Sequence, residues 1–118
     1  MLALLLLACA TGPRISIVDP AESDVVCGEP LVVDVDVTGF ELVAMDQPMA
    51  DGTGHIDLTL NGQDVMMGDQ PPFDIYGMED GFWELKAELV GNDHLSLDPP
   101  VADAIRIEID NSVCENQP

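Results

Sequence analysis

Apolar and polar residues alternate along most of this chain. The pattern is clearest over residues 31–37, where every odd-numbered position is apolar and Asp34 and Asp36 lie between them. Because successive side chains of a strand point to opposite faces of a sheet, this alternation predicts a strand with one face in the core and one in water. Similar apolar segments bounded by turn residues predict six further strands, at 14–26, 54–60, 63–67, 73–76, 82–90 and 103–109.

Turn-forming residues separate the predicted strands. Asn61-Gly62 favours a two-residue hairpin turn, since both residues accept the positive φ angles of a type I′ turn. Between residues 38 and 54 the alternation stops, and clusters of Asp, Pro and Gly indicate a long loop with one short strand at 40–43. Residues 91–100, which end in two prolines, are predicted as a second loop.

No long segment of the sequence shows a helical period. The predicted fold class is therefore all-β, an antiparallel β-sandwich of about seven strands. We call the end at which the chain enters the sandwich the near pole, and the opposite end the far pole. Alternating strand directions place the loops 38–54 and 91–100 together at the near pole, so that His55 and His94 approach each other.

Three stretches carry a resemblance to a known class of domain: residues 29–33 at the start of the second strand, residues 76–81 before the sixth, and the isoleucines of the seventh. They resemble the immunoglobulin-like or fibronectin-type-III-like domains of secreted bacterial lipoproteins. The resemblance covers roughly residues 14–110 and implies an Ig-like domain followed by a C-terminal tail, 111–118. The chain departs from the immunoglobulin pattern because Trp83 lies on the sixth strand and no cysteine pair joins the sheets.

The amino terminus carries a second resemblance. A short apolar run, Leu2 to Leu7, leads to Ala8 and Cys9, as in the lipobox of bacterial lipoproteins. The resemblance implies a signal peptide at 1–8, a lipid on Cys9, a tether at 9–13 and, because Ala10 follows the cysteine, the outer membrane of a Gram-negative bacterium. The run is too short for a spanning helix of ~20 residues, and the alternative is an ordinary secretory signal cleaved near Ala10.

Composition limits the partners that the chain can have. The 118 residues suffice for one domain, and 23 acidic against 3 basic residues give a formal net charge of −20. This charge repels the phosphates of nucleic acids and anionic lipids, so nucleic-acid binding is not expected, whereas cations or basic partners are attracted. With 47% hydrophobic residues in a periodic arrangement, the chain is expected to fold despite its charge.

Cys27 and Cys114 form an even pair once Cys9 is assigned to the lipid. In an oxidising compartment such a pair is expected to form a disulfide, and the alternative is two buried free thiols. The turn that holds Cys27 and the end of the last strand both lie at the far pole of the predicted topology. A Cys27–Cys114 bond is therefore compatible with the fold.

Metal binding is the most specific chemical hypothesis. Residues 52–57, Gly-Thr-Gly-His-Ile-Asp, resemble a Gly-x-Gly-His-x-His motif of uncharacterised secreted bacterial domains, and Asn92-Asp93-His94 resembles a second motif of these domains. His55 and Asp57 share the outward face of one strand, and with His94 they could hold Cu(II) or Zn(II), while Met45 and Met49 could add ligands for Cu(I). Alternatively, the histidines order the two loops and the methionines fill gaps in the core.

Calcium is the weaker cation hypothesis. The near-pole loops carry four acids that could supply oxygen ligands, but they lack the spacing of an EF-hand: Asp46, Asp51, Asp93 and Asp98.

The sequence also contains no nucleophile motif, glycine-rich phosphate loop or CxxC pair, and we do not expect an enzyme. The predicted function is a non-catalytic, lipid-anchored binding or structural module of the cell envelope. Its expected partners are the membrane, through the lipid, and an unidentified envelope or extracellular protein. The alternative is a periplasmic copper- or zinc-binding protein that uses His55, His94 and Asp57. The outward face of strand 31–37, with Val32, Asp34 and Asp36, is a further candidate contact surface.

Overall fold

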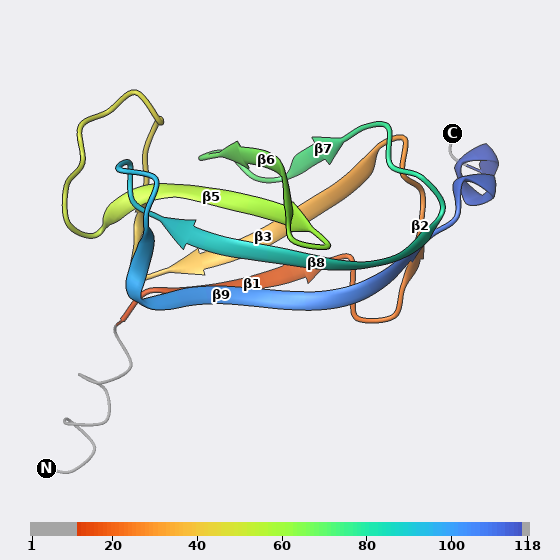
Figure 1. Cartoon of the computed structure of the whole chain (residues 1–118), viewed down its shortest axis with the longest axis horizontal. Coiled ribbons are helices and arrows are strands. Elements are labelled where there is room, and N and C mark those ends of the chain that lie inside the picture. The colour runs from red at the N-terminus through yellow and green to blue at the C-terminus, as the bar shows by residue number, and fades with distance from the viewer. Residues whose placement is uncertain (1–11, 117–118) are drawn as a thin grey trace, which may run out of the picture.

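The computed structural model describes residues 12–116, and in this part of the chain nine strands and one short helix are arranged in two layers (Figure 1). The elements are β1 (Arg14–Asp19), β2 (Val25–Val26), β3 (Leu31–Thr38), β4 (Glu41–Leu42), β5 (Thr53–Leu60), β6 (Gln63–Gly68), β7 (Phe73–Ile75), β8 (Gly81–Val90), β9 (Ser96–Ile109) and the 3₁₀-helix η1 (Asn111–Asn116). The signal peptide and lipid site predicted at 1–9 lie outside the described residues. No helix in the described part is long and apolar enough to cross a membrane.

Two sheets form the sandwich. The small sheet has the order β1-β3-β7, and the large sheet has the order β2-β9-β8-β5, with β4 and β6 both paired to β5. The predicted all-β, immunoglobulin-like sandwich is confirmed. The long strands pair in antiparallel fashion as expected, but β2–β9 and β4–β5 are short parallel pairs, which makes the large sheet mixed.

The first predicted strand, 14–26, is two strands in the structure. β1 pairs with β3 in the small sheet, whereas β2 pairs with β9 in the large sheet. Pro20 has no backbone N–H to donate and follows directly after β1, so the ladder ends there and the chain crosses to the other layer. The edge of β1 remains tied to the large sheet, because the Asp103 carboxylate on β9 accepts a hydrogen bond of 2.8 Å from the Ile17 backbone N–H.

The core lies between the two sheets and follows the alternation of the sequence. On β3, Leu31, Val33 and Val35 are buried while Val32 and Asp36 are exposed. Opposite them, β5 and β8 pair in antiparallel register, so that their buried residues form one apolar face. The fully buried side chains of this face are Ile56, Leu58, Leu60, Leu85, Ala87 and Leu89.

The loop predicted at 91–100 ends earlier than expected, because β9 begins at Ser96. In the β8–β9 ladder Val90 pairs with Ser96 and Leu89 with Val101, so residues 97–100 form an irregular insertion in β9. Pro99 and Pro100 lie in this insertion, where no ladder N–H is required of them. This is why two prolines are tolerated inside the longest strand.

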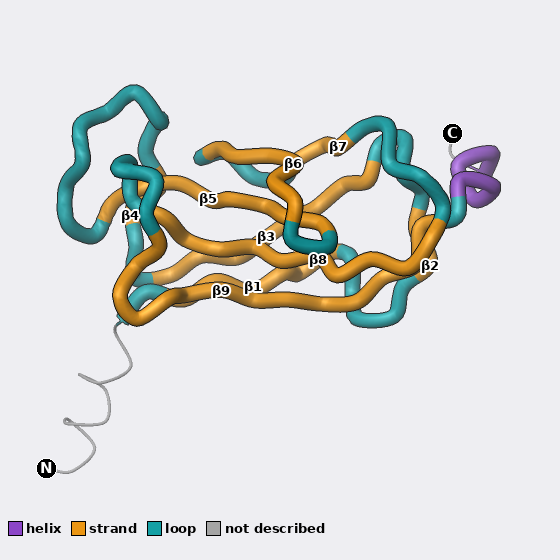
Figure 2. The backbone as a smooth tube through the Cα atoms, viewed as in Figure 1, coloured by secondary structure: helices purple, strands orange, loops and turns teal. Residues whose placement is uncertain are grey.

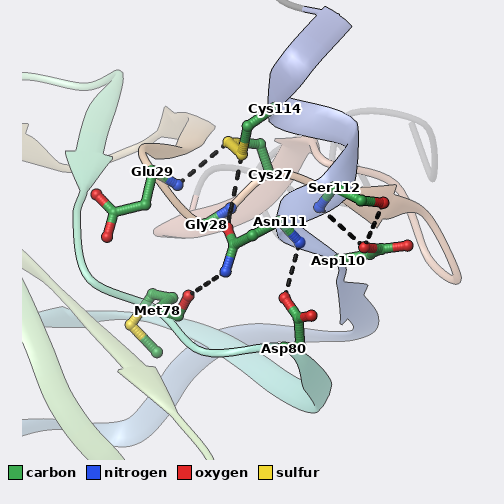
Figure 3. Close-up of a disulfide and its surroundings, with 9 residues drawn as sticks. All are labelled: Cys27, Gly28, Glu29, Met78, Asp80, Asp110, Asn111, Ser112 and Cys114. Atoms are coloured by element: carbon green, nitrogen blue, oxygen red, sulfur yellow. Dashed lines mark hydrogen bonds between the residues drawn. A yellow bond between two sulfur atoms is a disulfide. The ribbon is translucent and has the colours of Figure 1, made fainter.

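The predicted disulfide is confirmed at the far pole (Figure 3). Cys27 and Cys114 are bonded with their Cα atoms 5.1 Å apart, which ties the turn before β3 to η1. Asp110 accepts hydrogen bonds from the Ser112 hydroxyl (2.7 Å) and backbone N–H (3.0 Å) at the start of η1. The bond from the Ser112 side chain is the main reason that the pKa of Asp110 is lowered.

Asn111 joins three segments of the far pole. Its side-chain oxygen accepts from the Gly28 N–H at 2.8 Å and its amide donates to the Met78 carbonyl at 2.9 Å, while its backbone N–H donates to Asp80 at 2.7 Å. Gly28 is needed here because a Cβ would lie 2.6 Å from the Met78 carbonyl oxygen. The disulfide and Asn111 thus hold the C-terminal helix against the body of the domain.

Removing the disulfide is expected to destabilise the fold substantially. The bond closes a loop with a sequence separation of 87 residues. Releasing this constraint on the unfolded chain in the Cys27→Ser/Cys114→Ser double variant corresponds to about 4.5 kcal/mol. Urea unfolding with and without reductant measures this. Reductant should lower the midpoint of the parent chain and leave that of the double variant unchanged. Equal midpoints for the two chains without reductant would contradict the prediction.

Candidate functional site

Two loops meet at the near pole, on the left of Figure 2. One is residues 43–52 between β4 and β5, and the other is residues 91–95 between β8 and β9. They bring His55 and His94 together as predicted, with ring centroids 5.3 Å apart and the ring planes at 66°. The near pole therefore gathers the residues that the metal hypothesis named.

His55 lies on the outward face of β5, yet it has no solvent exposure. The sequence pattern predicted an outward side chain, which for a strand at a sheet surface would be in water. Here β5 lies very close to the point where β8 leads into the 91–95 loop, since a Cβ on Gly54 would overlap the Val90 carbonyl oxygen and lie 2.9 Å from the Gly91 Cα. The glycine permits the loop to close over the ring.

Asn92 determines which nitrogen of the neutral His55 ring carries the proton. The Asn92 amide nitrogen donates to the carbonyl oxygens of Ala44 and Gln47, both at 2.9 Å. Its remaining oxygen lies 2.9 Å from His55 Nδ1 and can only accept. Hydrogen-bond logic therefore assigns the proton to Nδ1, so in the neutral ring Nε2 carries a lone pair.

His55 Nε2 faces the carboxylate of Asp57. The two atoms His55 Nε2 and Asp57 Oδ1 are 3.4 Å apart, and both are buried without a hydrogen-bond partner among the described residues. Burial raises the pKa of Asp57 above its usual value, and the nearby His55 opposes this shift. Unpaired buried polar atoms are uncommon in folded proteins because each costs desolvation free energy.

The remaining residues of the metal hypotheses lie around this pair. His94 is exposed, and so are Met45 and Met49 at 40% and 47%. Met49 packs over the 91–95 loop, since a Cβ on Gly91 would lie 2.9 Å from its sulfur. Within residues 12–116 no three His, Cys, Asp or Glu side chains form a group that could hold a metal ion. The four acids of the calcium hypothesis are exposed: Asp46, Asp51, Asp93 and Asp98.

A second candidate site, which sequence reasoning missed, is a groove on β8 and β9 nearer the far pole. Its volume is about 470 Å³, and its lining includes Glu22, Phe82, Trp83, Glu84, Arg106 and Glu108. Phe82 is 79% exposed, the most exposed large apolar side chain of the described residues. The sequence signal that could have revealed this groove was Phe82, an aromatic residue at an outward position of the strand pattern.

Loops form the two walls of this groove. On one side Glu22 accepts from the Arg106 backbone N–H at 2.9 Å, and its second oxygen lies 3.5 Å from Arg106 Nε. On the other side Asn61 accepts from the Glu84 N–H at 2.8 Å and donates its own N–H to the Glu84 carbonyl. Three carboxylates and a single guanidinium line the groove, which leaves it net acidic.

Comparison with solved structures identifies the fold. The chain is similar to the fibronectin(III)-like modules of Clostridium thermocellum CbhA, with a TM-score of 0.57 and 15% identity over 84% of this chain and 47% of that chain. The fold is fibronectin(III)-like. An engineered protein is also similar, with a TM-score of 0.53 and 13% identity over 83% of this chain and 20% of that one.

The chain spans about half the length of the CbhA structure that it matches and a fifth of the engineered protein. No protein-family model and no curated protein matches the sequence. At these identities the similarity to a fibronectin(III)-like module concerns the fold alone, and function has to be argued from the two candidate sites.

The raised pKa of Asp57 predicts that Asp57→Asn stabilises the fold, and that this stabilisation depends on pH. A carboxyl whose pKa is higher in the folded than in the unfolded state lowers the free energy of unfolding at high pH. This loss is complete above the folded pKa and absent below the unfolded value of 3.8. In chelator, Asp57→Asn should therefore raise the free energy of unfolding near pH 7, and this gain should vanish as the pH falls below 3.8.

The exposed Asp51→Asn variant serves as the control for this measurement, because it removes one negative charge from the same acidic chain. Urea unfolding at several pH values gives both differences. A gain for Asp57→Asn that equals that of Asp51→Asn at neutral pH would contradict the assigned burial cost.

Proposed function

We propose that this chain is a non-catalytic binding module of the cell envelope, held at the membrane by a lipid on Cys9. Its fibronectin(III)-like fold and its disulfide support an extracytoplasmic module, because disulfides form and persist in oxidising compartments. The observation that carries the binding role is the acidic groove on β8 and β9, with its exposed Phe82 ring.

The chemistry of the groove favours a basic protein segment as its partner. A lysine or arginine side chain can lay its methylene stem and its charge on an exposed aromatic ring, which contributes about 0.5–1 kcal/mol. Glu22, Glu84 and Glu108 contribute carboxylates to the same groove. A second copy of the chain is disfavoured as the occupant, because each copy has a net charge of −20.

The groove also lies at the accessible end of an anchored domain. β1 begins at the near pole, whereas β8 begins and β9 ends at the far pole (Figure 1). Phe82 is the second residue of β8 and Glu108 the last but one of β9. A tether at 9–13 reaches at most ~18 Å when extended. An anchored module would therefore turn its near pole to the membrane and its groove away from it.

Groove binding can be followed through Trp83, which is the single tryptophan of the chain and lines the groove. A short arginine-rich peptide should change its fluorescence saturably, and a glutamate-rich peptide should not. Phe82→Ala should weaken binding about fivefold, which corresponds to the loss of one aromatic contact of about 1 kcal/mol.

Tyr76→Ala is the matched control, since Tyr76 is an exposed aromatic residue (64%) that does not line the groove. Its affinity for the arginine-rich peptide should equal that of the parent chain. Equal affinities for Phe82→Ala and the parent would show that the peptide is held elsewhere on the acidic surface and would refute the groove as the binding site.

The anchor is tested by Cys9→Ser in the full chain expressed in a Gram-negative bacterium. We expect the parent in the membrane fraction, with the mass of a diacylglycerol on its first residue, and the variant in the soluble periplasmic fraction. Ala10→Ser is the control, because it introduces the same side chain next to Cys9 and leaves that cysteine and the disulfide in place. A mature chain that begins at another residue and carries no lipid would favour the ordinary secretory signal.

A second candidate function is copper or zinc binding at the near pole by His55, Asp57 and His94. The observation that favours it is the pair of buried, unpartnered atoms His55 Nε2 and Asp57 Oδ1. Met45 and Met49 on the neighbouring loop could add thioether ligands for Cu(I).

A further inference from the structure

We infer that the groove on β8 and β9 binds a single arginine side chain of its partner, between the Phe82 ring and the Glu108 carboxylate. Arg106 restricts the groove to this one basic residue, because it already balances the other two carboxylates, Glu22 and Glu84. The inference rests on the proposed binding function of the groove. It specifies the residue that is recognised and the side chains that select it.

Four of the residues that line the groove form two cross-strand pairs. In the β8–β9 ladder Phe82 is directly opposite Glu108, and Glu84 is directly opposite Arg106. Because side chains two residues apart on a strand point to the same side, all four lie on one face of the sheet, and all four line the groove. The groove thus presents one ring and three charged groups in a fixed arrangement.

Both pairs are of the narrow kind, without hydrogen bonds between the two backbones. The N–H and C=O groups of Glu84 bond to Asn61, at 2.8 and 2.9 Å. Those of Arg106 bond to Glu22 and Ser23 on the other side of the ladder, at 2.9 and 2.7 Å. Neither residue therefore uses its backbone groups toward the other, and the pair two residues along the ladder is of the same kind. Side chains in such pairs are close, with Cβ atoms about 4.5–5.5 Å apart.

Arg106 balances two of the three carboxylates in the groove. Its Nε lies 3.5 Å from the Glu22 carboxylate, and Glu84 lies directly opposite it in the narrow pair. A second basic side chain that entered between these carboxylates would be repelled by the guanidinium, so it would gain little free energy from either carboxylate.

Glu108 is the carboxylate that has no counter-charge. Among the described residues no lysine, arginine or histidine forms an ion pair with it. Apart from Arg106, the lysine and arginine residues of the chain are Arg14 at the start of β1 and Lys86, whose Nζ lies 3.8 Å from Glu88. A cationic group of a partner would supply the missing charge.

Arginine fits this position better than lysine. A planar guanidinium can stack on an aromatic ring and also donate two hydrogen bonds to a carboxylate, whereas an ammonium is a compact, strongly hydrated charge. The 79% exposure of Phe82 leaves its ring open to such stacking. Glu108, directly opposite, supplies the acceptor oxygens.

Peptide titrations of the full chain, followed by Trp83 fluorescence, test the inference. A glycine–serine peptide with one arginine should bind saturably. Citrulline keeps the shape of arginine without its charge, so the citrulline peptide should bind at least about fivefold more weakly. The lysine peptide should lie between the two, and a lysine peptide that binds as tightly as the arginine peptide would refute the preference for arginine.

Glu108→Gln should weaken binding of the one-arginine peptide about fivefold, since it removes the unbalanced carboxylate and keeps the shape of the side chain. Glu84→Gln is the matched control, because it removes the same charge from the same groove. Its affinity should stay within about twofold of that of the parent, since Arg106 already balances Glu84.

Arg106→Gln tests the restriction to one basic residue. In the parent, a peptide with two arginines separated by one serine should bind only about twofold better than the one-arginine peptide, because either arginine can bind but not both. Arg106→Gln makes Glu22 and Glu84 available to the second arginine, and this ratio should rise to about tenfold. Circular dichroism establishes that each variant is folded before it is titrated.

Other outcomes would overturn the inference. Equal affinities for the arginine and citrulline peptides would refute recognition of the charge. Equal losses in Glu108→Gln and Glu84→Gln would refute the assigned position, and a ratio that Arg106→Gln leaves unchanged would refute the restriction. In each case the groove survives as a binding site if Phe82→Ala still weakens binding. If Phe82→Ala has no effect, or if no peptide binds to the parent, the proposed groove fails as well.

Discussion

The apolar layer between the two sheets is the constraint on which the rest of the structure depends. Each long strand gives one face to this layer, so the chain has room for chemistry only on the outer faces and at the two poles. Both candidate sites obey this rule. The groove lies on the outward side of β8 and β9, and the histidine pair lies where two loops fold over the end of β5.

At each pole the side chain of one asparagine hydrogen-bonds to several segments of the chain. Asn92 joins β5 to both near-pole loops, and Asn111 joins the Cys27 turn, the segment before β8 and η1. An asparagine side chain can both donate and accept, so one residue can satisfy backbone groups on several segments that a sandwich leaves unpaired at its ends. At the near pole this arrangement also buries a histidine, which leaves Nε2 of His55 without a partner.

The strand pattern and the disulfide could be predicted from the sequence because both follow from local rules. The period-two alternation predicted which side chains of β3, β5 and β8 face the core. The alternating strand directions placed Cys27 and Cys114 at one pole. The burial of His55 could not be predicted, because it depends on Gly54 and Gly91 letting a distant loop approach. The start of β9 was missed because two prolines indicate a loop, and only the pairing of Val90 with Ser96 and of Leu89 with Val101 reveals the insertion.

The two candidate sites have opposite demands on their surroundings, and the fold separates them accordingly. A site for a protein segment needs an open, solvent-facing surface, which the groove offers beside the 79% exposed Phe82. A site for a cation gains from desolvation and from rigid ligands, which the covered His55 and its bond to Asn92 supply. The same β8 strand carries both, because its first residues lie in the groove and its last residue precedes the loop that covers His55. A charge of −20 favours cationic ligands at either end, so the shape of each site, rather than its charge, has to distinguish a basic segment from a metal ion.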